Sequence, residues 1–492
     1  MFSKTTNLKI EKMQVAIIGA GMAGICMAIK LKKAKINFVI LEKSSGIGGT
    51  WRYNNYPGCA CDIPAHLYCY SFEMKHDWNQ VYPSQPEILK YLQHCTRKYN
   101  IYPHIRFNQE VISAHFNAQN CLWYVETAEK ETITANILIS AWGGLNLPKL
   151  PNLASLETFK GVSFHSARWN HSFDLTDKTV AVVGTAGSAV QFIPEVAKKV
   201  KKLLIFQRTP NWIYNRDDRT YSAQMQWYFK TFPILMQLYR GLLYLRNDLI
   251  IIHLLTTGSL IGKYLRKQLE KRIHQEINDS RVRDAVMPSY QPGCKRILFN
   301  NDFYQTLNRN NVELITDKIE SITSDSLVTE PGKDYNVDAI IYATGFNSLS
   351  YKKIDIRGKN GDSLAEIWGN EPEGYLGISV PNFPNFFSLL GPNTLLGHSS
   401  VILMVECQVN YIIGCLNKML REDWKSLEVK EEPMKRYYQD LWKTMEKKVW
   451  TKENCMSWYQ NKDGKVFALW PGNTIQYWWA TRKPVFDDYI ST

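Results

Sequence analysis

The chain has 492 residues, and because single hydrophobic cores stop growing at roughly 250 to 300 residues, we expect two or three domains. Its hydrophobic fraction of 45% and its charged fraction of 21% are typical of a soluble globular protein. The formal net charge of +13 comes from lysines and arginines that are scattered along the sequence, which argues against nucleic acid as a partner and suits anionic cofactors.

The ten cysteines form no CxxC pair and no Cys/His spacing of a metal site, so we expect buried thiols in a reducing cytoplasm and no bound metal. The N-terminus lacks the apolar segment of a signal peptide. One long apolar stretch, residues 232–261, contains Arg240, Arg246 and Asp248, and its longest uncharged run is shorter than the roughly 18 residues of a spanning helix. We expect buried helices there, and weak contact with a membrane surface is the alternative.

The first predicted element is an apolar strand, Val15 to Ile18, that ends in a glycine-rich turn and passes into a helical pattern. The turn has the GxGxxG spacing, with Gly19, Gly21 and Gly24. These glycines allow a tight turn, close approach of backbone to a pyrophosphate, and close packing of helix on strand. The next strand, Ile36 to Leu41, ends in Glu42, where a carboxylate accepts from ribose hydroxyls and repels a 2′-phosphate. The unit is predicted to bind FAD or NAD, and an ordinary βαβ unit is the alternative.

Glycines continue in the loop from Gly46 to Trp51, which either wraps a second part of the same ligand or is a plain surface loop. Residues 84–100 are predicted to form a helix, with a serine cap and a proline in the first turn. Residues 111–116 and 122–127 predict a small β-meander, and residues 135–140 predict a returning strand.

A second unit of the same kind begins with a strand at Thr179. Its turn consists of Gly184, Thr185, Ala186, Gly187, Ser188 and Ala189. The next strand, Leu203 to Gln207, ends in Arg208, where the first unit has its acid, and an arginine fork suits a 2′-phosphate. Ala186 replaces the second glycine, which we expect to shift the close approach to the pyrophosphate. This unit is predicted to bind NADPH, and a Rossmann-like unit without a nucleotide is the alternative.

The linker between the two units, Phe159 to Asn170, reads FKGVSFHSARWN. It resembles the FxGxxxHxxxW fingerprint of Baeyer–Villiger monooxygenases, flavoproteins that insert one oxygen atom from O2 beside a ketone carbonyl. Relatives that oxidise nitrogen or sulfur usually carry Tyr or Phe where this chain has Trp169. The sequence departs from the family pattern at Asn170, where Pro or Asp is usual.

The resemblance covers nearly the whole chain, and it implies an α/β fold with two Rossmann-like dinucleotide-binding domains. The FAD-binding domain is expected to be discontinuous, with residues 1–147 and 335–492. The NADP-binding domain is expected at residues 148–334, with a helical insertion at about residues 217–286 that covers the site.

The same resemblance implies which residues contact the cofactors. Besides the first turn and Glu42, the flavin contacts are expected at Gly49, Thr50, Trp51, Asp62, Tyr68, Val111 and Asn393. Arg208 and Thr209 are expected at the 2′-phosphate of NADPH, and Lys295 at an NADP phosphate.

The resemblance also implies the chemistry, in which NADPH reduces FAD, O2 forms a flavin C4a-peroxide, and this anion attacks a ketone to give an ester or lactone. Arg296 is predicted to stand beside the anion, because a guanidinium stays charged even when partly desolvated. Asp62 is predicted to orient Arg296 and to assist proton transfer. His165 and Trp169 are predicted to pack the linker rather than to catalyse.

Leu, Ile, Tyr and Phe are abundant between residues 226 and 261, which favours a hydrophobic ketone as substrate. Oxygenation of sulfur or nitrogen, and uncoupled oxidation of NADPH or mere nucleotide binding, stay open as alternatives. Trp169 favours the ketone, and the presence of both Asp62 and Arg296 argues against the uncoupled alternative. No oligomeric state is predicted.

Overall fold

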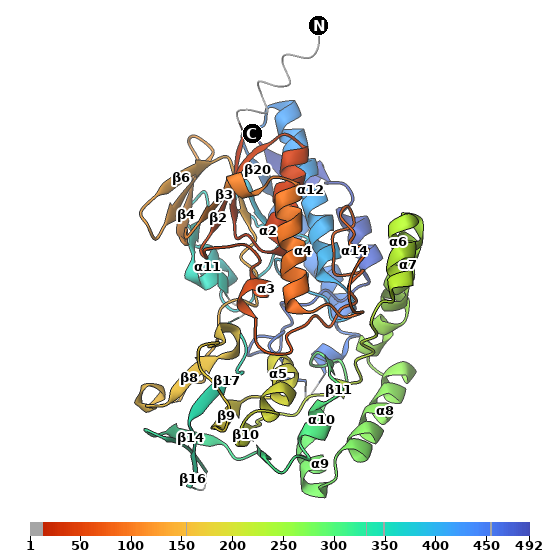
Figure 1. Ribbon diagram of the computed structural model, residues 1–492. Coiled ribbons are helices and arrows are strands. Elements are labelled where there is room, and N and C mark those ends of the chain that lie inside the picture. Colours follow the sequence, from red (N-terminus) through yellow and green to blue (C-terminus); the bar gives the residue numbers. More distant parts are fainter. Residues whose placement is uncertain (1–12, 154, 331, 348–349, 453–454) are drawn as a thin grey trace.

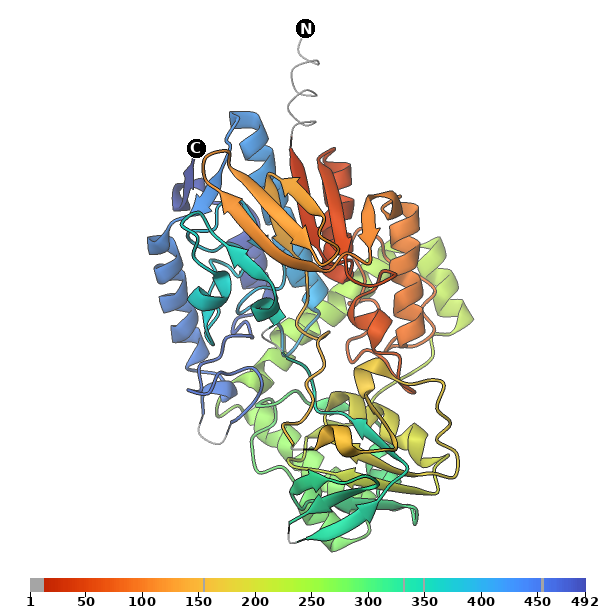
Figure 2. The same ribbon diagram turned by 90° about the vertical axis from the view of Figure 1, so that its left-hand side faces the viewer.

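The computed structural model describes residues 13–492, apart from residues 154, 331, 348, 349, 453 and 454. Figure 1 shows one sheet in the upper half of the molecule, another in the lower half, and a group of helices along the right-hand side. Figure 2 shows the same two halves one above the other, with connecting segments running between them.

The upper sheet is built around the first predicted strand. Its five strands run parallel, in the order β19 (Phe386–Ser388), β7 (Ile137–Ser140), β1 (Gln14–Ile18), β2 (Asn37–Glu42) and β3 (Ile105–Phe107). Val15 and Ile17 of β1 join one hydrophobic cluster, whereas Ala16 and Ile18 join another. Successive side chains of a strand point to opposite faces, so both faces of this sheet are covered.

Helices cover one face of the upper sheet. They are α2 (Met22–Lys33), α4 (Gln85–Lys98) and the long α12 (Val401–Glu422). A second, smaller sheet covers the other face, with strands β18 (Asp355–Arg357), β4 (Val111–Asn117), β5 (Leu122–Thr127) and β6 (Thr132–Ala135). The predicted helix at residues 84–100 and the predicted β-meander are confirmed.

The predicted returning strand at residues 135–140 is confirmed as β7, except that Ala135 is the last residue of β6, which belongs to the other sheet. Asn136 lies between them, and its side-chain oxygen accepts from the N–H of Gln14 at 2.8 Å. This bond fixes the chain at the start of β1, so the segment leaves the meander and enters the upper sheet.

The lower sheet also has five parallel strands, β13 (Val312–Ile315), β10 (Lys202–Phe206), β9 (Thr179–Val183), β17 (Ala339–Tyr342) and β8 (Val162–His165). One face is covered by α5 (Gly187–Ala197) and α10 (Phe303–Thr306). The other is covered by the antiparallel strands β14 (Ile319–Ile322), β15 (Ser326–Thr329) and β16 (Lys333–Asn336). The predicted α/β fold with two Rossmann-like units is confirmed.

The lower sheet extends beyond residue 334, where the NADP-binding domain was expected to end. Strand β17 pairs with both β9 and β8, and all four of its side chains are buried. A strand with parallel neighbours on both sides needs apolar residues on both faces, as the run AIIY provides. We therefore move the domain boundary to after Tyr342.

The last part of the chain returns to the upper half, where α12 lies (Figure 1) and where β19 joins the upper sheet. Its remaining elements are α11 (Leu364–Trp368), β20 (Leu427–Val429), α13 (Glu431–Met445), α14 (Thr474–Thr481) and β21 (Tyr489–Ser491).

The predicted insertion is helical, with α6 (Ala223–Thr231), α7 (Pro233–Leu249), α8 (Leu260–Glu276) and α9 (Ser280–Val286). Helices α6, α7 and α8 lie along the right-hand side of Figure 1, with α9 at the bottom. The interpretation of residues 232–261 as buried helices is wrong, because Leu238 is 58% exposed and Leu242 is 68% exposed. None of the helices in the described part of the chain has the length and hydropathy needed to cross a bilayer.

His66 lies where the insertion packs against the upper half. Its ring makes edge contacts with Tyr221, Phe229 and Tyr239, with ring centroids 4.9 to 5.4 Å away. Its carbonyl oxygen accepts from the guanidinium of Arg240. Burial, reinforced by the charges of Arg240 and Lys75, lowers the pKa of His66 to about 3. The imidazole is therefore neutral in the folded protein at neutral pH.

The lowered pKa of His66 predicts that the folded protein loses stability in acid. The pKa of His66 is lower in the folded protein than in the unfolded chain. The contribution of the neutral imidazole to stability is therefore complete above the unfolded pKa, and it is lost progressively as the pH falls below that value. Between pH 7 and pH 5 the loss is about 2 kcal/mol. His66→Phe should remove this part of the pH dependence in denaturant unfolding, whereas exposed His171→Asn should leave it unchanged. An equal pH slope in wild type and His66→Phe would contradict this assignment.

Candidate active site

The first glycine turn forms a cradle at the end of β1. Gly19 has φ +104°, and a Cβ there would approach the carbonyl oxygen of Ala141 to 2.7 Å. At Gly24, an added Cβ would lie 2.0 Å from the carbonyl oxygen of Gly19, so α2 packs directly on the turn. The helix is preceded by Gly21, and no side chain caps it. Its first N–H groups are thus available to a pyrophosphate, which fits FAD.

The Glu42 carboxylate lies beneath this turn and is buried. Its Oε2 accepts from the N–H of Ala20 at 2.7 Å, and its Oε1 accepts from the N–H and the hydroxyl of Ser44 at 2.9 and 2.7 Å. A carboxylate has about four acceptor sites, so these three bonds leave one for a ribose hydroxyl. Glu42 therefore holds the turn, and it keeps one acceptor for the ribose hydroxyl that is expected there.

The glycine-rich loop folds over the turn. A Cβ added to Gly49 would approach the Cα of Gly21 to 3.1 Å, so the two backbones nearly touch. Thr50 and Trp51 begin the short helix α3 (Thr50–Tyr53), and the Trp51 indole N–H donates to the hydroxyl of Tyr68 at 3.0 Å. This proximity favours a loop that wraps the ligand over a plain surface loop.

Two other expected flavin contacts lie in different surroundings. Val111 is buried at the start of β4, two residues after Gln109, whose N–H donates to the carbonyl of Glu42 at 2.9 Å. Asn393 is buried, and its side-chain amide donates to the carbonyls of Val466 and Leu469 at 2.9 and 3.2 Å. The backbone N–H of Asn393 also donates to the carbonyl of Phe467 at 2.8 Å, so both its side chain and its N–H fix the C-terminal segment.

The second turn repeats the geometry of the first. Gly184 also has φ +104°, and a Cβ there would meet the carbonyl oxygen of Ala343 at 2.6 Å. Helix α5 follows Ala186 and has no side-chain cap. Ala186 and Gly187 are exposed at the turn, Ser188 is half-buried, and Ala189 is buried against the sheet. The side chain of Thr185 is buried and donates to Gln207 at 3.3 Å, so it supports the turn from below.

Arg208 and Lys295 form a pair of cations beside this second turn. Arg208 is exposed just after β10, with Thr209 half-buried beside it. Burial, and then the charge of Arg208, lower the pKa of Lys295. In the described part of the chain no carboxylate forms an ion pair with either residue. Two neighbouring cations without an acid between them fit a bound phosphate.

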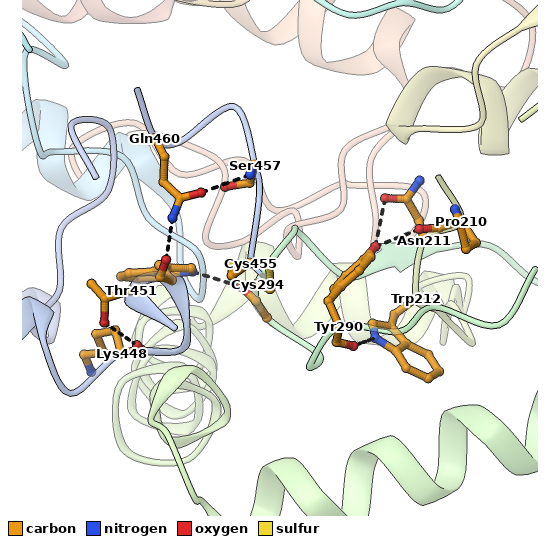
Figure 3. Close-up of a disulfide and its surroundings, with 12 residues drawn as sticks. Pro210, Asn211, Trp212, Tyr290, Cys294, Lys448, Thr451, Cys455, Ser457 and Gln460 are labelled. Carbon is orange, nitrogen blue, oxygen red and sulfur yellow. Dashed lines mark hydrogen bonds between the residues drawn. A yellow bond between two sulfur atoms is a disulfide. The ribbon is translucent and has the colours of Figure 1, made fainter. Parts of the chain in front are cut away.

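Tyr290 holds these two cationic loops together. Its hydroxyl donates to the carbonyl of Pro210 at 2.9 Å, and its own carbonyl accepts from the indole N–H of Trp212 at 2.8 Å (Figure 3). The Lys295 ammonium lies 4.9 Å above the Tyr290 ring. Tyr290 is not predicted from the sequence, because nothing in the local sequence links it to residues 210–212.

Arg296 and Asp62 form a bidentate ion pair, although they are 234 residues apart. The Arg296 Nε and Nη2 donate to the two Asp62 oxygens, the latter at 2.8 Å. Burial works against the charged guanidinium, but Asp62 outweighs it and holds the pKa of Arg296 above its ordinary value. Neither bond uses Nη1, so the permanently charged guanidinium keeps a donor that can point toward a negative oxygen.

The fingerprint linker packs where the two halves meet. The His165 Nδ1 accepts from the N–H of Ala167 at 3.1 Å, and burial lowers the pKa of His165 to about 4. The Trp169 ring lies edge-on to Phe164 and Phe192, each with centroids 5.2 Å away. These contacts agree with a packing role for both residues.

Gln191 of α5 provides a further connection that sequence analysis missed. Its side-chain oxygen accepts from the Tyr56 hydroxyl at 3.1 Å and from the Ala60 N–H at 3.2 Å, and its amide donates to the Ala60 carbonyl at 3.1 Å. A polar residue between apolar neighbours in GSAVQFIPEVA was the available signal. The loop that leads to Asp62 is thereby fixed on the helix of the second nucleotide unit.

Cys294 and Cys455 form a disulfide, so the expectation of free thiols is wrong for this pair (Figure 3). The two residues are 161 positions apart, and no local spacing reveals them. Next to the disulfide, the Trp450 indole N–H donates to the carbonyl of Gly293 at 2.9 Å. The loop that carries Lys295 and Arg296 is therefore attached to the C-terminal segment.

A family profile described as flavin-binding monooxygenase-like matches residues 12–357. The chain is 38% identical over 486 residues to a Baeyer–Villiger monooxygenase of Pseudomonas aeruginosa, covering 98% of this chain and 92% of the relative. It is 35% identical over 482 residues to another from Streptomyces coelicolor, covering 97% and 92%.

Solved structures agree with this result. Cyclohexanone monooxygenase from Rhodococcus sp. Phi1, bound to NADP+, superposes with a TM-score of 0.87 at 26% identity, covering 97% of this chain and 99% of that one. The OTEMO complex with FAD and NADP gives 0.86 at 28% identity, covering 98% and 99%. The chain belongs to the flavin-binding monooxygenase-like family, and within it to the Baeyer–Villiger monooxygenases. The predicted enzyme class, an FAD-dependent NADPH monooxygenase, is confirmed.

The neighbouring cations Arg208 and Lys295 predict a preference for NADPH over NADH. Arg208→Ala should weaken NADPH binding by about 1.5 to 3 kcal/mol, the range for a charged hydrogen bond, because the 2′-phosphate loses its guanidinium. NADH lacks that phosphate and serves as the internal control, so its steady-state constants should barely change. An equal loss for both cofactors would remove Arg208 from the phosphate site.

The disulfide predicts a redox-dependent stability. Cys294→Ser with Cys455→Ser should lower the free energy of unfolding by roughly 2 to 4 kcal/mol, because the unfolded chain is no longer cross-linked. Wild type in excess dithiothreitol should match the double variant, and Cys121→Ser, at a free cysteine, should not differ from wild type. Alkylation of all ten cysteines in non-reduced protein would show that the bond does not form.

Proposed function

We propose that the enzyme inserts one oxygen atom of O2 into a hydrophobic ketone to give an ester or lactone, with water as the second product. NADPH supplies two electrons, and one proton is taken up from solvent to balance the reaction. Bound FAD, once reduced by NADPH, supplies the chemistry that activates O2. The Asp62–Arg296 ion pair is the observation that carries this proposal, because it fixes a permanently charged guanidinium on the loop that also carries Lys295.

In the proposed mechanism Arg296 is the catalytic cation. Asp62 occupies two donors of the guanidinium, which fixes its plane, and Nη1 remains to donate to an oxygen that becomes negative during the reaction. A donor held in place before the reaction needs no reorganisation when charge develops. Asp62 acts by orienting Arg296 and accepts or returns a proton at a carboxylate oxygen.

The cofactor contacts are part of the same proposal. The Gly19–Gly24 turn and Glu42 would hold the pyrophosphate and a ribose of FAD, with Gly49, Thr50, Trp51, Tyr68 and Val111 around the rest of the ligand. The Gly184–Ala189 turn would hold the pyrophosphate of NADPH. Arg208, Thr209 and Lys295 would hold its phosphate groups.

An apolar substrate is supported by the surroundings of the Arg296 loop. A Cβ at Gly293 would meet Leu255 at 3.0 Å and Val449 at 3.5 Å, and both belong to an aliphatic and aromatic cluster that includes Trp450. Arg240, which could have anchored an acidic substrate, donates instead to backbone carbonyls of His66 and Cys69. One related structure is named for cyclohexanone, an apolar ketone.

We also propose a cytoplasmic location, because eight of the ten cysteines are free thiols, as is usual in a reducing compartment. Seven of these eight are buried. In a reducing compartment the Cys294–Cys455 pair would exchange with cellular thiols.

Substitution of the catalytic cation separates reduction from oxygenation. Arg296→Ala should still oxidise NADPH but should lose ester formation by about 100-fold or more, the range for one preorganised donor. Arg296→Lys keeps the charge without the bidentate geometry and should fall between the two. NADPH consumption, hydrogen peroxide and ester are quantified together, with exposed Arg309→Ala as the matched control. Wild-type ester yield in Arg296→Ala would exclude this arginine from the reaction.

The substrate class is tested by product analysis. Cyclic, aryl and long-chain ketones are incubated beside thioethers and amines, and esters, lactones, sulfoxides and N-oxides are quantified. We expect esters or lactones from apolar ketones, because the cluster beside Arg296 is apolar. Sulfoxides without any ester or lactone would replace the proposal by heteroatom oxygenation.

A further inference from the structure

Helix α7 has an aliphatic stripe on its solvent-exposed side. Its outward stripe consists of aliphatic residues at helical spacing, each 42% exposed or more: Ile234, Leu235, Leu238, Leu242, Leu245 and Leu249. The opposite side, which faces the protein, is mixed. It carries buried Asn247 and Asp248 and half-buried Arg240, and it also packs Met236, Tyr239, Leu243 and Tyr244 against the protein. A surface helix normally turns its apolar stripe to the core. Here the leucines of this stripe face outward, so they do not contribute to the packing of this chain.

The inward polar groups show why the helix lies this way. The Asp248 carboxylate accepts from the ring of His398 at 3.1 Å and from the Thr474 and Ile475 N–H groups at 3.0 and 3.2 Å. Arg240 donates to backbone carbonyls of the upper half. Buried charged groups of this kind must keep their partners, so rotation of the helix to bury its leucines would be strongly unfavourable.

Neighbouring segments continue the apolar stripe. We define the apolar face as the six aliphatic residues of α7 together with Trp227, Tyr228, Phe232, Leu260, Ile261 and Tyr264, all exposed. Trp227 and Phe232 are in ring contact, and α6, α7 and α8 follow one another along the right-hand side of Figure 1. At the end of α7, the hydrogen bonds to Asp248 attach the start of α14. Helix α14 exposes Ile475, Trp478 and Trp479. Monomers rarely expose an apolar surface of this extent without a binding role.

Cations outnumber acids around the apolar face. Between residues 223 and 269 the only acidic residue is Asp248, which is buried and bonded to His398. The exposed charged residues of this stretch are Lys230, Arg246, Lys263 and Lys267, and α14 is followed by exposed Arg482 and Lys483. Glu270, the next acid along α8, is paired with Arg266, and exposed Asp487 follows Arg482 and Lys483. A cationic rim around leucines and tryptophans matches an interface of anionic lipid headgroups over acyl chains.

We propose that the apolar face binds in the plane of an anionic lipid surface, with the α7 leucines in the acyl boundary and the lysines and arginines at the headgroups. A second copy of this chain is the competing occupant. A twofold contact through this face would place its mainly cationic rims against each other, which is unfavourable. The same cations are favourable against anionic lipid, because they lie near the headgroup charges.

The test is flotation of the FAD-loaded full-length enzyme with vesicles of phosphatidylcholine and phosphatidylglycerol, and with phosphatidylcholine alone. Wild type should float with the anionic vesicles, and the floated fraction should fall at high salt. Leu238→Glu with Leu242→Glu should reduce the partition coefficient at least 10-fold, while NADPH oxidation in solution stays unchanged. Ile112→Glu, at a 46% exposed residue of β4, is the matched control and should float like wild type.

Lys263→Glu with Lys267→Glu tests the headgroup contact separately, and should remove the preference for anionic vesicles. Wild type that floats with neither vesicle would overturn the proposal. Sedimentation velocity distinguishes the competing occupant: a wild-type dimer that Leu238→Glu with Leu242→Glu converts to monomer would show that the apolar face is an interface between copies and would also overturn it.

Discussion

The ion pair between Asp62 and Arg296 is the contact on which the site depends. One partner follows the glycine-rich loop of the upper half, and the other lies on the loop before β12 (Leu298–Phe299) in the lower half. A half-buried charge without its partner would be strongly unfavourable, so the pair constrains how the two halves meet. The bidentate geometry constrains orientation as well as distance, because a planar guanidinium fork accepts a carboxylate in few arrangements.

The neighbouring contacts keep that pair in place from both sides. Gln191 fixes the Tyr56–Ala60 loop on α5, which positions the chain just before Asp62. The disulfide of Cys294 and the Trp450–Gly293 hydrogen bond attach the Arg296 loop to the C-terminal segment. A residue that must stabilise a developing charge has to be held to within a fraction of an ångström, and these supports act on the backbone on either side of the pair.

The parts that sequence could predict are those whose chemistry is local. The two glycine turns, Glu42 and Arg208 lie in short segments in which strand, turn and helix follow directly, and local spacing determines their geometry. The Asp62–Arg296 pairing came from family resemblance, because no pattern within one segment connects residues so far apart. Tyr290, Gln191 and the Cys294–Cys455 disulfide act between distant segments and were missed for the same reason. The domain boundary was misplaced because β17 looks like any buried strand until its parallel neighbours are known.

The burial of α7 could not be predicted from the composition of the helical insertion. Composition gives the number of apolar residues in residues 232–261 but does not say which side of the helix the protein covers. The answer depends on partners far away: His398 and Thr474 for Asp248, and the carbonyls of His66 and Cys69 for Arg240. These polar contacts attach the insertion to the upper half of the molecule, not to the second nucleotide unit. The same contacts turn the leucines outward, so the anchoring of the insertion and the apolar face have a single physical cause.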